Sequence, residues 1–255
     1  MSRANFRAER IDWYDSFDRA DGPMGRDWID GHDVAPTMFD PLGIHDGAVV
    51  VTDPHARGPP ENYEPEVHPS LNTHPPADGK LYPGIGWVAR PCPPGWLPDI
   101  EMTWAGWWDT SVGAHAEATP LLWVDPDNPL GGFGCWPSAF TADGGSPATG
   151  VGFVGFMGAP PELFNEDEAP VIGTFGFSVT NRVPIRIRTR DTGTHVETSF
   201  DGVVKSSIAV THPLIASLRG NSDLHGIELD THFCRPRSAI PSMPGALNIR
   251  FRGIG

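Results

Sequence analysis

Hydrophobic and polar positions along this chain alternate over short runs, and almost none of them recur at helical spacing. The runs are rich in β-branched and aromatic residues and are interrupted by Gly, Pro, Asp or Asn, a pattern typical of strands joined by turns. We therefore expect an all-β chain. The predicted strands cover residues 48–52, 100–108, 120–124, 150–157, 172–179, 183–190, 195–200, 226–232 and 247–252.

The clearest alternation lies at 185–190, where isoleucine or threonine alternates with arginine. A strand with this period buries one face and leaves the other in solvent, as in an antiparallel sheet. The turn Asp191-Thr192-Gly193-Thr194 and a second turn at Asp201-Gly202 mark hairpins. One short helix is expected at 213–218, because it begins with a proline. The fold class is thus a two-sheet antiparallel β-sandwich with at most one or two short helices.

Residues 53–98 do not follow this pattern. They contain twelve prolines, and proline cannot donate to a β-ladder. Loops of more than about 15 residues are uncommon in compact domains unless they are functional or unstructured. We therefore expect a proline-rich irregular excursion that either binds a partner or forms a flexible flap. The domain organisation is then an N-terminal docking arm at 1–14, with Phe6, Ile11 and Trp13 available for docking, followed by a β-sandwich domain at 15–255.

The charge balance excludes two classes of partner. The net charge is -14 and the sequence pI is near 5.0, whereas nucleic acid and anionic membrane surfaces require concentrated Lys and Arg. The N-terminal residues are polar, and no apolar run of about 18 residues occurs, so we expect neither a signal peptide nor membrane insertion. Cys92, Cys135 and Cys234 are far apart. They encode neither a disulfide framework nor a zinc knuckle, although a single bridge stays open.

The segment from Asp15 to Trp28 carries a specific motif, Asp-Ser-Phe-Asp-Arg-Ala-Asp-Gly-Pro-Met-Gly-Arg-Asp-Trp. It resembles the opening of the concanavalin A-like/laminin G-like jelly-roll domains of actinobacteriophage, or mycobacteriophage-like, minor tail proteins, which reads roughly D-x-F-x-R-A-D-G-x-L-G-x-x-W. Met24 stands where leucine is usual, which is a volume-conserving exchange. The hairpin at 183–202 and the segments 226–230 and 247–252 look like later strands of such sandwiches.

The resemblance implies a concanavalin A-like jelly roll in a virion, made in the host cytoplasm and assembled at the tail tip or baseplate of a phage. The partners that it implies are other phage tail proteins, a homo-oligomer in the assembled tail, and cell-wall polysaccharide of the host. Fold alone does not fix function. Three roles therefore stay open: a structural protein of the tail, a carbohydrate-binding module and a jelly-roll glycoside hydrolase.

No catalytic machinery is evident. Glycoside hydrolysis requires two carboxylates flanking the scissile bond, and the pairs Asp99/Glu101 and Glu228/Asp230 do not continue into the E-x-D-x-x-E pattern of jelly-roll glucanases. Residues 150–155 match GxGxxG by letter, but a strand is expected where a dinucleotide site requires a helix. We expect no catalytic residues and a chain that is not an enzyme.

Two groups of side chains could hold a metal ion. His225, Asp230 and His232 lie close in one predicted strand, but no spacing matches a zinc signature. The turn after 124 offers oxygens to a hard cation such as calcium, without EF-hand spacing. Its candidate calcium ligands are Asp125, Asp127 and Asn128. Ordinary histidines and a plain proline-stiffened turn are the expected alternative, so no cofactor is predicted apart from this calcium candidate.

Tryptophan is the residue type that most favours ligand contact, because its flat face can stack on sugar rings or anchor an interface. Strand alternation places Trp104 and Trp108 on one face and Trp107 on the other. The candidate glycan or interface contacts are Trp87, Trp96, Trp107 and Trp136. The alternative is that most tryptophans pack in the core or at a subunit interface.

Overall fold

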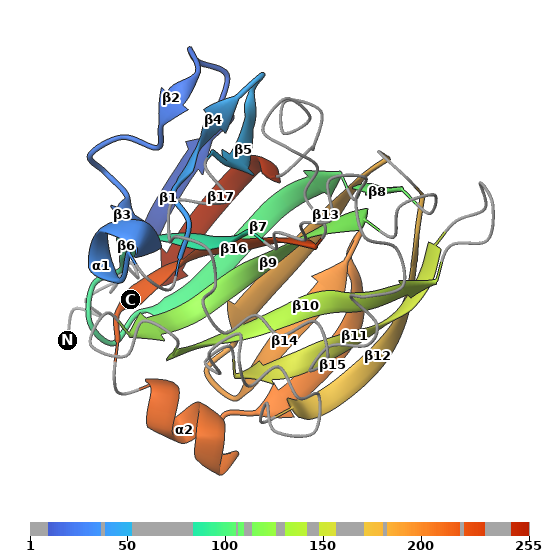
Figure 1. The fold of residues 1–255 in the computed structure, drawn as a ribbon. Coiled ribbons are helices and arrows are strands. Elements are labelled where there is room, and N and C mark those ends of the chain that lie inside the picture. The colour runs from blue at the N-terminus through green and yellow to red at the C-terminus, as the bar shows by residue number, and fades with distance from the viewer. Residues whose placement is uncertain are drawn as a thin grey trace.

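Two antiparallel sheets pack face to face in the computed structural model (Figure 1), which confirms the predicted all-β sandwich. The structure describes residues 10–36, 39–52, 84–105, 107–109, 114–125, 131–141, 148–156, 171–180, 183–219, 222–232 and 246–254. Within these ranges there are two short helices, α1 (Gly31–Val34) and α2 (Pro213–Arg219). The second confirms the helix predicted at 213–218. No helix in the described residues is both long and apolar enough to cross a membrane.

The first sheet has nine strands. Its spatial order is β15 (Val203–Ala209), β14 (His195–Phe200), β13 (Pro184–Asp191), β7 (Leu97–Ala105), β17 (Ala246–Ile254), β5 (Ala48–Val51), β4 (Leu42–His45) and β2 (Gly22–Pro23), and β1 (Arg10–Asp15) also pairs with β17. The two predicted turns join neighbouring strands of this sheet, β13 to β14 and β14 to β15. Gly193 and Gly202 in these turns have φ of 88° and 82°.

The second sheet has eight strands. Its spatial order is β12 (Val171–Val179), β11 (Ala148–Phe156), β10 (Gly131–Thr141), β9 (Ala114–Asp125), β16 (Leu224–His232), β6 (Gly84–Pro91) and β3 (Ile29–Asp30), and β8 (Trp107–Asp109) pairs with β9. The GxGxxG segment lies in β11, as expected from its strand-like flanks.

The main core lies between the sheets. Inward-facing residues of both sheets are buried there, among them Ile100, Met102, Ile227 and Leu229. A smaller cluster that includes Phe39 and Trp87 packs under α1 and the chain that follows it. The alternation of inward and outward side chains therefore matches the period-two pattern of the sequence.

The Asp15–Trp28 motif has a structural role in this core. The carboxylate of Asp15 accepts hydrogen bonds from the backbone of Phe17 at 2.8 Å and from Arg19 at 2.6 Å. The guanidinium of Arg19 also donates to the carbonyl of Met24 at 3.0 Å. Phe17, Met24 and Trp28 are all buried. The motif is thus a self-bonded turn that places three apolar side chains in the core.

Strands lie in part of the predicted excursion and of the docking arm. Residues 84–91 form β6 and residues 97–98 begin β7, so the predicted excursion at 53–98 is wrong for them, while 53–83 lie outside the described residues. A Cβ on Gly86 would lie 2.4 Å from the carbonyl oxygen of Asp40. Gly86 therefore allows close packing of this strand. Residues 10–14, assigned to the docking arm, belong to β1 and pair with β17.

The strand predicted at 100–108 is also wrong as a single element. β7 ends at Ala105 in the nine-stranded sheet, and β8 begins at Trp107 in the eight-stranded sheet. Strand alternation therefore does not relate Trp104 to Trp107. The physical reason is that consecutive strands of a sandwich can belong to different sheets, which a period-two pattern along the sequence does not reveal.

Candidate functional site

The four candidate tryptophans have different environments. Trp87 is 1% exposed, so its prediction as a surface contact is wrong. Its ring packs edge to face on Phe39 at 5.9 Å, and a Cβ on Gly31 would lie 2.8 Å from the indole, so α1 can cover it closely. Trp107 and Trp136 lie in β8 and β10, and their side chains are outside the described set. Trp96 alone of the four is described as half-buried.

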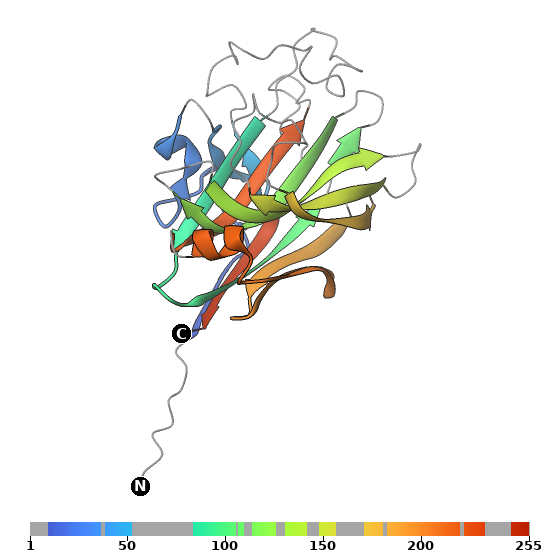
Figure 2. The ribbon, with the colours of Figure 1, turned by 90° about the horizontal axis from the view of Figure 1, so that it is seen from below.

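Trp96 lines a pocket of about 370 Å³ at one end of the sandwich. The pocket lies next to α2, whose position at the strand ends is seen in Figure 1 and Figure 2. Its size falls within the range of roughly 300–1,000 Å³ that is typical of small-molecule sites. The lining residues are Gly95, Trp96, Trp123, Val210, Ala216, Arg219, Asp223 and His225.

Local turn geometry positions the indole of Trp96. Its backbone N–H donates to the carbonyl of Pro93 at 3.1 Å, and Gly95 has a φ of 80°, a conformation that favours glycine. A Cβ on Gly253 of β17 would lie 3.0 Å from Trp96 and 3.2 Å from the sulfur of Cys92. The missing side chain of Gly253 therefore leaves space for the indole.

A bulge in β9 shapes the floor of the pocket. Leu224 pairs with Val124 and Gly226 pairs with Leu121, so two residues of β9 face His225 alone. One of them is Trp123, which has a φ of 56° although it is not glycine. Such a conformation costs on the order of 1–2 kcal/mol, and unfavourable backbone conformations of this kind concentrate at functional sites.

His225 is a neutral histidine under this bulge. Its Nδ1 accepts a hydrogen bond from the backbone N–H of Trp123 at 3.1 Å. Burial lowers the pKa of His225 to about 3, because a desolvated imidazole resists protonation. A neutral imidazole that accepts at Nδ1 carries its proton on Nε2. The network thus assigns a tautomer with a donor at Nε2.

The two charged side chains that line the pocket, Arg219 and Asp223, differ in their surroundings. Nε of Arg219 donates to Oδ2 of Asp191 at 2.6 Å, and the Asp191 side chain is 1% exposed. Asp223 is exposed, and its backbone carbonyl accepts from the N–H of Cys92 at 2.8 Å. Burial raises the pKa of the Cys92 thiol to about 11, so this cysteine stays protonated. Among the described residues, the pocket therefore combines a paired cation, an exposed carboxylate and an aromatic wall.

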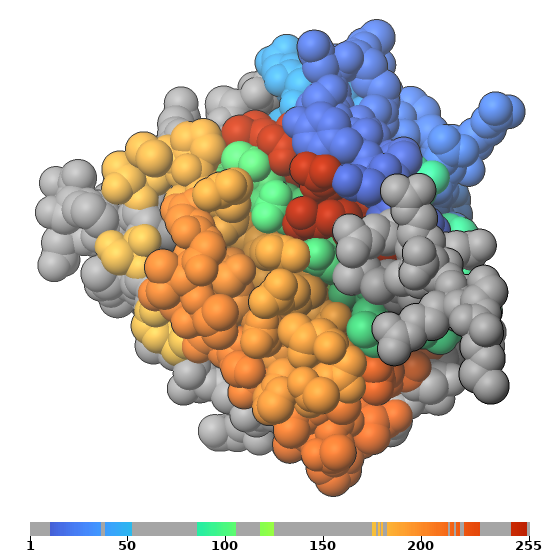
Figure 3. Space-filling view, turned by 180° about the vertical axis from the view of Figure 1, so that it is seen from behind, coloured from blue at the N-terminus to red at the C-terminus, as the bar shows by residue number. Residues whose placement is uncertain are grey.

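A second group of polar side chains covers the outer face of the nine-stranded sheet. In Figure 3 this face runs from the orange of β13 and β14 through green β7 and red β17 to blue β1. Opposite charges face each other across neighbouring strands, which favours the observed register. One row contains Glu197, Arg190, Asp99, Arg252 and Asp12, and the adjacent row contains Arg188, Glu101 and Arg250.

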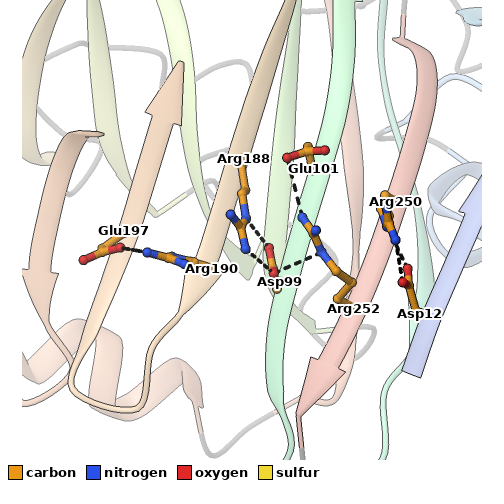
Figure 4. Close-up of polar contacts among 8 residues, drawn as sticks. All are labelled: Asp12, Asp99, Glu101, Arg188, Arg190, Glu197, Arg250 and Arg252. Carbon is orange, nitrogen blue, oxygen red and sulfur yellow. Dashed lines mark hydrogen bonds and ion pairs between the residues drawn. The ribbon is translucent and has the colours of Figure 1, made fainter. Parts of the chain in front are cut away.

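The close-up in Figure 4 shows that these charges are paired with one another. Arg188 donates to both carboxylate oxygens of Asp99, at 2.7 and 2.6 Å, and Arg252 lies 3.1 Å from the same group. The hydrogen bond to Asp99 raises the pKa of Arg188 above its usual value. A depression of about 230 Å³ on this face is lined largely by these paired groups. The face is therefore compensated internally.

This pairing bears on the candidate catalytic carboxylates. Both oxygens of Asp99 are occupied by Arg188, and Glu101 lies 3.5 Å from Arg252. A general acid or nucleophile must instead reach a substrate. Glu228, from the other pair, is buried in β16, and the side chain of Asp230 is outside the described set.

Metal candidates are scattered. Asp125 ends β9, but its side chain, Asp127 and Asn128 are outside the described set, so the calcium prediction stays a prediction. Sequence reasoning missed a trio of Asp21, His45 and Asp46, whose donor atoms lie within 4.8 Å of one another. Nδ1 of His45 lies 2.7 Å from Asp21. These residues come from two turns that only the β2–β4 pairing brings together.

Comparison with solved structures supports the jelly-roll architecture. An endo-1,3-β-glucanase from Streptomyces sioyaensis superposes with a TM-score of 0.52 at 11% identity, over 100% of this chain and 99% of the glucanase. SCLam, a non-specific endo-β-1,3(4)-glucanase of family GH16, gives 0.51 at 10% identity, with 96% and 91% covered. The carbohydrate recognition domain of Emp47p gives 0.50 at 11% identity, with 94% and 93% covered.

No protein-family model matches the sequence, and no curated protein matches it. At these identities the solved structures show a shared fold, which is carried by lectin-like and glucanase domains alike.

Proposed function

We propose that this chain is a non-enzymatic virion protein of a phage tail tip or baseplate, a minor tail protein, whose sandwich contacts glycan on the host surface. The observation that carries the glycan contact is the pocket beside Trp96. Among the described residues it combines a half-buried indole, the buried imidazole of His225 and an exposed carboxylate on Asp223. Aromatic walls with a few convergent polar groups are typical of small-molecule sites.

The tail assignment draws on the resemblance of the Asp15–Trp28 motif. Since the motif residues form a turn that closes the core, they support the kind of sandwich rather than a chemical activity. The proposed partners are other tail proteins and further copies of this chain. An acidic chain stays soluble before such an assembly forms. A carbohydrate-binding module outside a virion is the alternative, and it uses the same pocket.

The non-enzymatic part of the proposal is supported by the pairing of Asp99 with Arg188 and Arg252. A carboxylate engaged in this way is not free to transfer a proton to a glycosidic oxygen. The proposal includes no cofactor.

The test is sedimentation of the full chain with insoluble cell-wall polysaccharide of an actinobacterial host, with released reducing sugar assayed in the same tube. The wild type is expected to bind saturably without releasing sugar. Trp96→Ala is expected to weaken binding about tenfold or more, equivalent to ~1.4 kcal/mol, because the stacking face is lost. Tyr14→Ala is the matched control, since Tyr14 is an aromatic residue of the outer face and is 57% exposed.

Sugar release by the wild type would contradict the non-enzymatic assignment. Equal binding by Trp96→Ala and wild type would remove the pocket from the glycan contact. Peptide mass spectrometry of purified phage particles tests the tail assignment, which predicts that the chain is present at a fixed stoichiometry. Its absence from particles would leave the carbohydrate-binding module.

A further inference from the structure

The chemistry of the Trp96 pocket narrows its ligand, provided that the proposed glycan contact holds. We infer that the pocket takes an uncharged polyhydroxyl ring, with one face against Trp96 and one hydroxyl oxygen accepting a hydrogen bond from Nε2–H of His225. The ligand class is then a neutral sugar unit rather than a uronate or a phosphate-bearing wall polymer.

The donor at Nε2 of His225 favours a ligand with a hydroxyl oxygen. The residue His225 is 2% exposed, and the hydrogen bond that the described part of the chain gives it is the one at Nδ1. Because Nδ1 accepts, Nε2 donates, and this ring lines the pocket. A donor that lines a pocket gains an acceptor when a ligand oxygen lies opposite it, so such an oxygen is favoured at this point. Buried polar groups that lack a partner also discriminate strongly against ligands that cannot pair with them.

The charged side chains that line the pocket favour a neutral ligand over an anionic one. Arg219 is the cation among the lining residues, and the buried carboxylate of Asp191 already neutralises it. Asp223 adds an exposed negative charge that no described cation pairs with, and the whole chain carries -14. An anionic ligand therefore meets repulsion, and the cation among the described lining residues is already held by Asp191. A neutral ring with hydroxyl groups avoids this repulsion and can accept from the N–H of His225.

The backbone of Trp123, at the floor of the pocket, has an unfavourable conformation that positions the donor of His225. The positive φ of Trp123 turns its N–H toward His225 instead of the strand ladder. Without that bond the imidazole could adopt either tautomer. The bulge therefore acts as a positioning element for the donor. Such a conformation persists when the surrounding structure determines it.

The experiment is calorimetric titration of the full chain with two sets of soluble probes. One set is neutral glucan and galactan oligosaccharides, and the other is oligogalacturonate and poly(glycerol phosphate). Neutral probes are expected to bind at least about tenfold more tightly than anionic ones at low salt. His225→Gln retains an oxygen for Trp123 and an N–H for the ligand, so it should bind within about threefold of wild type. His225→Leu lacks both and should lose about tenfold or more.

Thermal unfolding of both variants verifies that each is folded before titration, and His225→Gln carries the test if His225→Leu does not fold. Equal affinity in His225→Leu and wild type, or a loss beyond about tenfold in a folded His225→Gln, would overturn the role of the donor. Preferred binding of an anionic probe that still requires Trp96 would overturn the ligand class and leave the proposed function standing. Binding of none of the probes by the wild type would overturn both.

Discussion

The outer face of the nine-stranded sheet and the Trp96 pocket both concentrate polar side chains, yet they differ in how far oppositely charged groups pair with one another. On the outer face Asp99, Arg188 and Arg252 pair across neighbouring strands. In the pocket His225 keeps a donor for which the described chain supplies no acceptor. A dense array of charge can thus be neutralised largely within itself, whereas a donor that lines a pocket and has no acceptor in the described chain is open to a ligand.

The largest effect on this comparison is expected from Asp191→Ala. Asp191 bonds both Arg219 at 2.6 Å and the backbone N–H of Gly193 at 2.6 Å. Its loss should lower the free energy of unfolding by about 2–3 kcal/mol, because hydrogen bonds to a buried charged group are removed. Urea denaturation measures it. The freed Arg219 should also admit anionic glycan, and an unchanged preference for neutral probes would contradict the charge argument.

Gly253→Ala should affect stability and binding together. The new methyl group meets Trp96 and Cys92 at 3.0 and 3.2 Å, so the indole must move, at a cost of about 1–3 kcal/mol. Glycan affinity should fall in parallel. Gly176→Ala is the matched control, since a Cβ there meets nothing within 4 Å. If both variants bind glycan equally, the position of Trp96 is not what the ligand requires.

The neutral state of His225 predicts a pH effect on stability. The pKa of His225 is about 3 in the fold, whereas an ordinary histidine has a pKa of 6.5. Between these two pH values the unfolded chain therefore binds one proton more than the folded chain. Stability from this group is therefore full above pH 6.5 and falls by about 1.4 kcal/mol per pH unit as the pH drops toward 3. Urea midpoints at pH 7, 6 and 5 should decline more steeply for wild type than for His225→Gln. Parallel slopes would mean that the histidine is not buried in a neutral form.

The smallest effect is expected on the outer face. A double-mutant cycle of Arg188→Ala and Asp99→Ala should give a coupling energy of about 0.5–1 kcal/mol, because the Arg188 side chain is 29% exposed and solvent screens the pair. Both single variants should bind glycan as wild type does. A loss of glycan binding in either one would move the contact from the pocket to this face.

Local signals predicted much of the fold. The alternation at 185–190 predicted an outward row of arginines, and Gly193 and Gly202 predicted turns, because each depends on neighbours in sequence. The burial of Trp87 was not predictable in this way, since its covering residues, Gly31 and Phe39, lie far away in the chain. β6 was missed because the prolines before and after it led to the prediction of one irregular segment at 53–98.

The candidate site was predicted in part. Trp96 was identified beside its proline and glycine neighbours, which place it in a loop. Its pocket also requires α2, the bulge at Trp123 and the start of β16, which only the tertiary fold brings together. His225 was read as an ordinary histidine, because nothing in the sequence reveals the hydrogen bond to Trp123. The partners of Asp99 were likewise hidden, since a register between distant strands supplies them.

Glycan is proposed to bind the Trp96 pocket at the end of the sandwich and not the charged outer face of the nine-stranded sheet. Amide hydrogen exchange with and without saturating neutral oligosaccharide tests this proposal most directly, because it reports both surfaces in one experiment. Bound oligosaccharide is expected to add protection to the amides of Trp96, of the end of α2 and of residues 222–225. The amides of Arg188 in β13 and of Arg250 in β17 are expected to exchange as before. Protection confined to β13 and β17 would contradict the proposal.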